Sequence, residues 1–189
     1  MSENWTFFNQ WVKKPTQLGT FLPISKKFAK NAIENIISQH HIKTLNTLNV
    51  LELGAGTGRI TRVLLETGFQ KITAIELNDS LANLMKKQLK DKVTILQDDA
   101  RNITKHFPEN SFDMIVSSLP LMYIPHPIRQ DIIEAAFTVL KKDALFLHLC
   151  YTPSASWFQL NHVKSQKTLS QWTHFPTGFV YEFSKVAAS

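Results

Sequence analysis

VLELGAGTGR, running from Val50 to Arg59, is the stretch of sequence that decides the fold. An apolar strand leads into a loop with glycines at positions 54, 56 and 58, and the loop opens a helical pattern. Glycines at such a turn let the backbone bend sharply and come close to a ligand. The segment therefore predicts a Rossmann-like cofactor loop at the first crossover of an α/β sheet.

Short apolar runs alternate with helical patterns beyond this loop. We expect strands at 49–53, 71–77, 92–97, 112–118 and 143–151, and crossovers at about 58–66, 80–90, 100–107 and 128–141. This alternation predicts a mostly parallel sheet built from βαβ units. The aromatic and β-branched stretch 172–184, interrupted by a proline and a glycine, predicts a final antiparallel strand pair.

Two helices are expected before the sheet. One begins at a Ser25 N-cap and carries its core face on Phe28, Ala29, Ala32, Ile33, Ile36 and Ile37. The other covers residues 3–14, where Trp5, Phe7, Phe8 and Trp11 share one arc and Lys13 and Lys14 lie opposite. This pattern predicts a helix that binds a membrane surface, the alternative being that its aromatics pack on the domain. We therefore expect residues 1–45 to form a membrane-binding and capping segment, and residues 46–189 to form the domain that carries the cofactor loop.

Composition limits the classes of protein to consider. The 189 residues are 43% hydrophobic and 19% charged, as in a globular protein. The single cysteine, Cys150, allows no internal disulfide, and we find no apolar run long enough to span a membrane, so we expect a cytoplasmic protein. The net charge is +6 and is concentrated in the first quarter of the chain, which favours an anionic partner such as a phospholipid surface or a nucleic acid.

Acidic residues around the loop indicate the charge of its ligand. Glu52 lies two residues before the first glycine, where a carboxylate would repel a pyrophosphate but accept a cation. S-adenosylmethionine has a sulfonium and an ammonium group and no phosphate. Glu76 lies at the end of the second strand, at a spacing typical of ribose-binding acids. Asp99, after the third strand, can accept a hydrogen bond from an adenine amino group.

In this order, the loop and the two later acids resemble class I S-adenosylmethionine-dependent methyltransferases. The resemblance implies that S-adenosylmethionine is the cofactor and that no metal is needed. The cofactor-binding residues that it implies lie at the ends of the first four strands: Glu52, Gly54, Ala55, Gly56, Gly58, Glu76, Leu77, Asp99, Ala100, Ser117 and Leu119.

The methyl acceptor is expected at the end of the fourth strand, where residues 117–125 read SSLPLMYIP. Methyltransferases that act on adenine amino groups have an asparagine and an aromatic residue where this chain has Ser118 and Leu121. The chain instead resembles bacterial phospholipid N-methyltransferases, along residues 7–25, 147–157 and 174–183 as well as the two loops. The resemblance implies N-methylation of phosphatidylethanolamine toward phosphatidylcholine at the inner face of the cytoplasmic membrane, with no nucleic acid partner. An ornithine-lipid or RNA methyltransferase, and a membrane-binding module without activity, remain alternatives.

The chemistry requires loss of a proton from the amine. A primary ammonium has a pKa of about 10.4, so its neutral form lies about 4–5 kcal/mol uphill at pH 7. Our catalytic candidates are Tyr123, Tyr151 and Ser118. The two tyrosines lie at or just past strand ends, where they can accept a proton or face a cationic head group, and Ser118 belongs to the acceptor loop. His148 is expected to be a core histidine, and Cys150 is not expected to act as a nucleophile.

Overall fold

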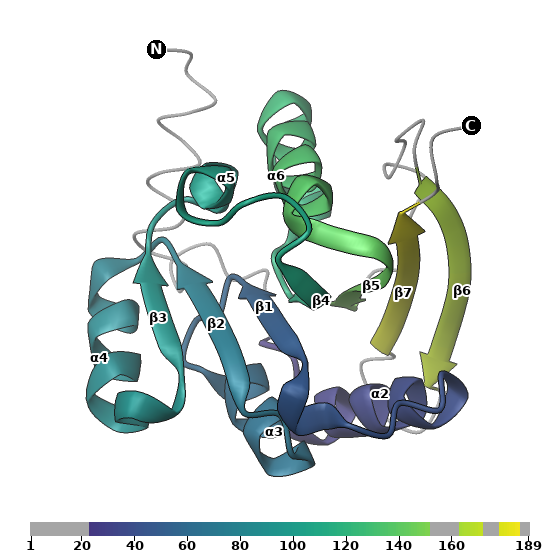
Figure 1. Cartoon of the computed structure of the whole chain (residues 1–189). Coiled ribbons are helices and arrows are strands. Elements are labelled where there is room, and N and C mark those ends of the chain that lie inside the picture. Colours follow the sequence, from purple (N-terminus) through teal and green to yellow (C-terminus); the bar gives the residue numbers. More distant parts are fainter. Residues whose placement is uncertain (1–22, 152–162, 172–177, 186–189) are drawn as a thin grey trace.

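A computed structural model describes residues 23–151, 163–171 and 178–185, the middle stretch by its backbone alone (Figure 1). These residues form a seven-stranded sheet with the order β3-β2-β1-β4-β5-β7-β6. The strands are β1 (Asn49–Leu53), β2 (Lys71–Glu76), β3 (Thr94–Gln97), β4 (Phe112–Ser117), β5 (Leu140–Cys150), β6 (Val163–Gln171) and β7 (Gly178–Lys185). The first five are parallel, whereas β7 runs antiparallel to both β5 and β6.

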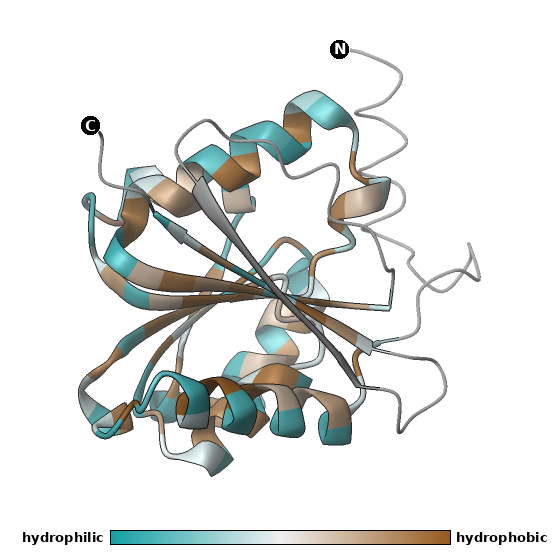
Figure 2. Ribbon diagram, turned by 90° about the vertical axis from the view of Figure 1, so that its right-hand side faces the viewer, coloured by the Kyte–Doolittle hydropathy of each residue, from teal (hydrophilic) through white to brown (hydrophobic). Residues whose placement is uncertain are grey.

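The helices cover both faces of this sheet, as the side view in Figure 2 shows. They are α2 (Lys26–Gln39), α3 (Arg59–Thr67), α4 (Asp79–Leu89), α5 (Ile103–His106) and α6 (His126–Val139). Side chains of α2, α3 and α4 share one apolar cluster, and those of α5 and α6 share the other. Consecutive strand residues enter opposite clusters, since Val50 belongs to the first and Leu51 to the second. The predicted α/β class, mostly parallel with an antiparallel C-terminal strand, is confirmed.

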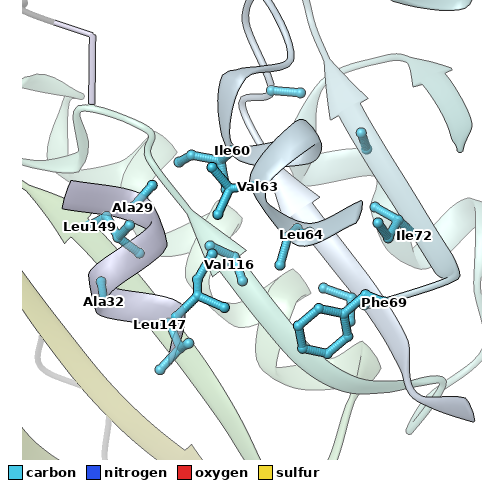
Figure 3. Close-up of a cluster of buried hydrophobic side chains, with 14 of the residues drawn as sticks. Ala29, Ala32, Ile60, Val63, Leu64, Phe69, Ile72, Val116, Leu147 and Leu149 are labelled. Atoms are coloured by element: carbon cyan, nitrogen blue, oxygen red, sulfur yellow. The ribbon is translucent and has the colours of Figure 1, made fainter. Parts of the chain in front are cut away.

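The core between α2, α3 and the sheet forms as the periodicity predicts. Ser25 caps α2, its hydroxyl oxygen accepting a hydrogen bond from the Phe28 amide at 3.1 Å. Ala29 and Ala32 bring this helix close to Leu147 and Leu149 of β5, and Figure 3 shows them meeting there beside residues of α3. This packing holds α2 beside the start of α3, which is also the end of the cofactor loop.

Two boundaries differ from the prediction. The expected pair at 172–184 is wrong in its extent, because β6 ends at Gln171 and lies entirely before that window. Its sequence, VKSQKTLSQ, is mostly polar, as suits a strand at the edge of a sheet, and so gives no apolar signal. The last parallel strand begins at Leu140 rather than 143, because Leu140 is buried and pairs with Phe112 of β4 directly after α6 ends.

The register of the central strands brings the expected site together. Leu53, the last residue of β1, pairs with Ile75 of β2 on one side and with Ser117 of β4 on the other. The glycine loop therefore leaves the sheet between the ends of β2 and β4, at the carboxyl edge where ligands bind in open α/β sheets.

The expected N-terminal helix, with Trp5, Phe7, Phe8, Trp11, Lys13 and Lys14, lies outside the described residues, so the division at residue 45 stays a prediction. Within the ranges that are described, no helix is long and apolar enough to cross a membrane.

Candidate active site

The glycine loop is held against the end of β2. The amides of Gly54 and Ala55 both donate to the carbonyl of Ile75, at 3.0 and 3.2 Å. Gly54 and Gly56 have φ values of +73° and +57°, which favour glycine. A Cβ atom at Gly54 would lie 2.4 Å from Leu119, whereas one at Gly56 would meet nothing within 4 Å. The loop is therefore closed on the side of β4 and open at Gly56, where a ligand can approach the backbone.

Glu52 is a buried carboxyl group just below this loop. It is fully buried, and its Oε2 accepts a hydrogen bond from the Thr61 hydroxyl of α3 at 2.5 Å. Burial, with a smaller contribution from the charge of Glu76, raises the pKa of Glu52 to about 8, although the hydrogen bonds from Thr61 oppose the shift. Its Oε1 is buried with no hydrogen-bond partner among the described residues. This oxygen can accept a hydrogen bond from a ligand, and a cationic ligand would favour the ionised form.

Glu76 lies at the end of β2 and faces the same loop. Its Oε2 accepts from the Gly56 amide at 2.7 Å, and its Oε1 accepts from the Asn78 amide at 2.8 Å. A carboxylate oxygen has two acceptor positions, so each oxygen can accept one further donor. The two hydroxyls of a ribose are such donors, and Glu76 is placed where sequence spacing predicts a ribose-binding acid.

The two acids after β3 have separate partners. Asp99 forms two hydrogen bonds with Arg101, whose Nε and Nη2 donate to its two carboxylate oxygens at 3.2 and 2.9 Å. Asp98 accepts from the Asn102 amide group at 2.8 Å and contacts His106 Nε2 at 2.6 Å. Burial alone would raise the pKa of Asp98, but hydrogen bonds from Asn102, His106 and the Asp99 amide outweigh it and lower the pKa. Sequence reasoning did not find Arg101, although it lies only two residues after Asp99.

The expected acceptor loop lies directly over the glycine loop. The Ser118 amide donates to the Leu53 carbonyl, and its hydroxyl donates to the Gly54 carbonyl, both at 3.4 Å. Further along, the short helix η5 (Leu121–Tyr123) buries Leu121 but leaves Tyr123 58% exposed. Of these candidates the structure therefore brings Ser118 to the cofactor loop and leaves Tyr123 more than half exposed.

Arg129 was also missed, because a charged residue on the inner face of α6 contradicts the helical pattern. Its side chain is buried, and Nη1 donates to the Leu121 carbonyl at 3.2 Å. Burial lowers the pKa of this guanidinium from its usual value, but arginine remains charged at neutral pH. The hydrogen bond fixes the turn that carries Tyr123.

The Tyr151 side chain packs against the start of α2, where its hydroxyl group is hydrogen-bonded. Its hydroxyl oxygen accepts a hydrogen bond from the Ser25 amide at 2.8 Å, and its ring lies 5.9 Å from that of Phe28. Arg59, the first residue after the loop, donates to the Ile24 carbonyl at 3.2 Å. Tyr151 and Arg59 thus hold the chain entering α2 against the carboxyl edge. His148 is buried, as predicted, and burial lowers its pKa to about 4, so it is neutral at pH 7.

These features fit the cofactor that the sequence suggests. A buried carboxyl oxygen at Glu52 suits an ammonium group, the open space at Gly56 admits a ligand to the backbone, and Glu76 retains acceptors for a ribose. Of the remaining expected positions, Leu77 directly follows β2, Ser117 ends β4, and Ala100 begins the short helix that follows β3.

Comparisons with known proteins bear on the same region. A family model described as a methyltransferase domain matches residues 50–143, which span the glycine loop, both acid positions and the acceptor loop. A putative methylase from Haemophilus influenzae has the same fold, with a TM-score of 0.63 and 16% identity over 84% of this chain and 99% of that one. The chain is a class I S-adenosylmethionine-dependent methyltransferase. Its predicted cofactor, S-adenosylmethionine, is confirmed at the level of the family.

Two relatives of this methyltransferase differ in how much they share with it. An ornithine lipid N-methyltransferase from Singulisphaera acidiphila is 23% identical over 160 residues, which is 81% of this chain and 80% of that protein. A mitochondrial ribosomal RNA small subunit methyltransferase from Arabidopsis thaliana is 33% identical over 93 residues, which is 47% of this chain and 23% of that protein.

Proposed function

We propose that this methyltransferase transfers methyl groups to the amino head group of phosphatidylethanolamine, toward phosphatidylcholine, at a membrane surface. The observation that carries the proposal is the extent of the match with the ornithine lipid N-methyltransferase. It reaches over 160 residues and so extends well beyond residues 50–143, which match the general methyltransferase domain. The matches with ribosomal RNA small subunit methyltransferases cover less of this chain, from 47% to 64% of it.

The acceptor loop supports an amine on a lipid rather than one on a base. Position 118 has a hydroxyl in place of an amide that could pair with a base, and position 121 has a leucine that is 1% exposed. A buried leucine offers no ring for stacking. The exposed ring is that of Tyr123, and we propose that its face contacts the ammonium of the substrate or of the methylated product.

The residues of the site have two tasks in this proposal. The bound cofactor supplies a methyl group on a positively charged sulfur. Ser118, whose hydroxyl lies against the loop at Gly54, and Tyr123 orient the amine toward that methyl group and accept hydrogen bonds from it. A site that removes water and lies near a positive charge lowers the pKa of the amine, which favours its neutral, nucleophilic form.

Ornithine lipid is a second candidate substrate, favoured by the name of the relative from Singulisphaera acidiphila. It shares with phosphatidylethanolamine a primary amine on a membrane lipid, so the same site chemistry applies to both. The membrane surface enters the proposal through Trp5, Phe7, Phe8, Trp11, Lys13 and Lys14, which we propose lie at the lipid interface. The protein would then be peripheral on the cytoplasmic membrane.

The proposal is tested by following labelled methyl groups from S-adenosylmethionine into separate acceptors. The purified chain is mixed with phosphatidylglycerol vesicles containing phosphatidylethanolamine, with the same vesicles containing ornithine lipid, or with bulk ribosomal RNA. We expect label in mono-, di- and trimethylated phosphatidylethanolamine. Label in ornithine lipid alone would transfer the proposal to that lipid, and label in RNA alone would refute it.

Membrane binding is measured on the same vesicles. A chain lacking residues 1–14 is expected to sediment with them much less than the full chain, because four aromatic side chains and two lysines are lost. Its affinity for S-adenosylhomocysteine is expected to be unchanged, since Glu52 and Glu76 remain. Equal sedimentation of the two chains would contradict a membrane role for this segment.

A further inference from the structure

Arg101 and Asp99 form a tight local pair at the end of β3. Asp99 caps the short helix η4 (Ala100–Asn102), its Oδ1 accepting from the Arg101 amide at 2.9 Å. The guanidinium of Arg101 then closes on the carboxylate with Nε 3.2 Å from Oδ1 and Nη2 2.9 Å from Oδ2. A planar guanidinium that binds both oxygens fixes the plane of the carboxylate as well as its position.

The contacts with Arg101 leave one hydrogen-bond acceptor position of the Asp99 carboxylate available. A carboxylate offers about four, two on each oxygen. The amide and Nε of Arg101 take both positions on Oδ1, and Nη2 takes one on Oδ2. One acceptor position on Oδ2 therefore remains for a ligand, and its direction is set by Arg101.

The Asp99–Arg101 pair also interacts with a neighbouring helix, α6. Arg101 Nη1 lies 4.0 Å from a carboxylate oxygen of Asp131 on α6. Asp98, the next acid along the chain, is engaged by Asn102 and His106 and so does not compete for the guanidinium. Asp99 is 8% exposed and lies at the carboxyl edge, two strands from the glycine loop.

We propose that Arg101 is a positioning residue that aims the remaining acceptor of Asp99 at the amino group of the cofactor's adenine, and so determines selectivity for adenine. A single directed acceptor binds the amino group but has no partner for the carbonyl oxygen that hypoxanthine carries at the same position. A buried acceptor left without a donor weakens binding of such an analogue strongly. The proposal concerns the cofactor and does not depend on which amine is methylated.

The test compares two ligands in binding, without turnover. Affinities of S-adenosylhomocysteine and S-inosylhomocysteine are measured by calorimetry for the full chain and for Arg101→Met, which keeps the length of the side chain. We expect the full chain to prefer the adenine ligand by about tenfold or more, as for a hydrogen bond to a charged group. In Arg101→Met this ratio is expected to fall to about threefold or less, because the carboxylate of Asp99 can rotate.

Asp131→Asn is the matched control. It removes the more exposed ion pair of Arg101 and leaves the contacts with Asp99, so the ratio of affinities is expected to stay at the value of the unmodified chain. A ratio that is unchanged in Arg101→Met, with only the melting temperature lowered, would show that Arg101 is structural and would overturn the proposal. A ratio that rises would also overturn it, because Arg101 would then compete with adenine for Asp99.

Discussion

Glu52, near the end of β1, and Asp98, just after β3, are carboxyl groups at the same edge of the sheet, yet their surroundings are opposite. Glu52 is fully buried, is bonded by the hydroxyl of Thr61, and has an oxygen without a partner among the described residues. Asp98 is 27% exposed in its side chain and is surrounded by donors from Asn102, His106 and the next amide. The pKa of Glu52 rises to about 8, whereas that of Asp98 falls below its ordinary value.

The difference indicates different roles for the two groups: Glu52 has an acceptor oxygen left for a ligand, whereas Asp98 stabilises the fold. A buried carboxyl group that lacks donors gains most from a cation that arrives later. A carboxylate that already has several donors stabilises its own loop and has little left to offer. Acidic residues at a strand end are therefore not equivalent, and hydrogen bonding distinguishes them.

The largest expected effect comes from closing the open side of the loop. Gly56→Ala adds a Cβ where no protein atom lies within 4 Å, so the methyl group projects into space that we assign to the cofactor. We expect affinity for S-adenosylhomocysteine to fall by about a hundredfold or more, as measured by calorimetry, because a cofactor group and the loop backbone can no longer meet.

Gly68→Ala is the matched control, since Gly68 also has a positive φ, +114°, but ends α3 far along the helix from the loop. Both variants are expected to lose about 1 kcal/mol of stability from the strained backbone. Only Gly56→Ala should lose cofactor binding. Equal affinities in the two variants would place the cofactor elsewhere.

A second change replaces the titratable carboxyl group of Glu52 by an amide. The pKa of Glu52 is raised in the folded chain, so its contribution to stability is full below about pH 4.5 and is lost as the pH rises toward 8. Without cofactor, the free energy of unfolding should therefore fall by roughly 2–4 kcal/mol between pH 5 and pH 8. In Glu52→Gln this fall should disappear, which urea denaturation at several pH values would reveal. A variant with the same pH dependence would contradict the buried, protonated state.

The smallest effect is expected at Asp98. Its pKa is lowered by folding, so its contribution is present above the ordinary value of 3.8 and is lost as the pH falls through the folded pKa. Asp98→Asn is expected to cost about 1 kcal/mol at pH 7 and to make the loss of stability below pH 4 shallower. Asp91→Asn, at an exposed position in the short helix after α4, is the control and should leave stability at pH 7 unchanged. If Asp98→Asn lost as much stability below pH 4 as the unmodified chain, these hydrogen bonds would contribute little.

The sequence predicts the central part of the fold well, for a physical reason. β1 begins and ends where expected because a short apolar run is followed directly by glycines, and α2 begins at Ser25 because a hydroxyl there satisfies a free amide. The polar edge strand β6 was placed wrongly, since its pairing with β7 depends on a neighbour and not on its own pattern.

The candidate site could be predicted by position but not by hydrogen bonding. Glu52 and Glu76 stand where the spacing indicates, beside the glycine loop. The partners that determine what each acid does, Thr61 for Glu52 and Arg101 for Asp99, follow from how helices and turns meet the sheet. The same holds for Arg129, whose position on an apolar face has meaning only once the carbonyl of Leu121 is seen above it.

The most direct test of the role assigned to Glu52 is the pH dependence of cofactor affinity. If the ligand's ammonium binds the ionised carboxylate, the association constant for S-adenosylhomocysteine should rise roughly five- to tenfold between pH 6 and pH 7, because the ionised fraction of a group with a pKa near 8 grows by about that factor. Glu52→Gln should bind more weakly and show a flat profile over this interval. An equal rise in both proteins, or no rise in either, would contradict the account.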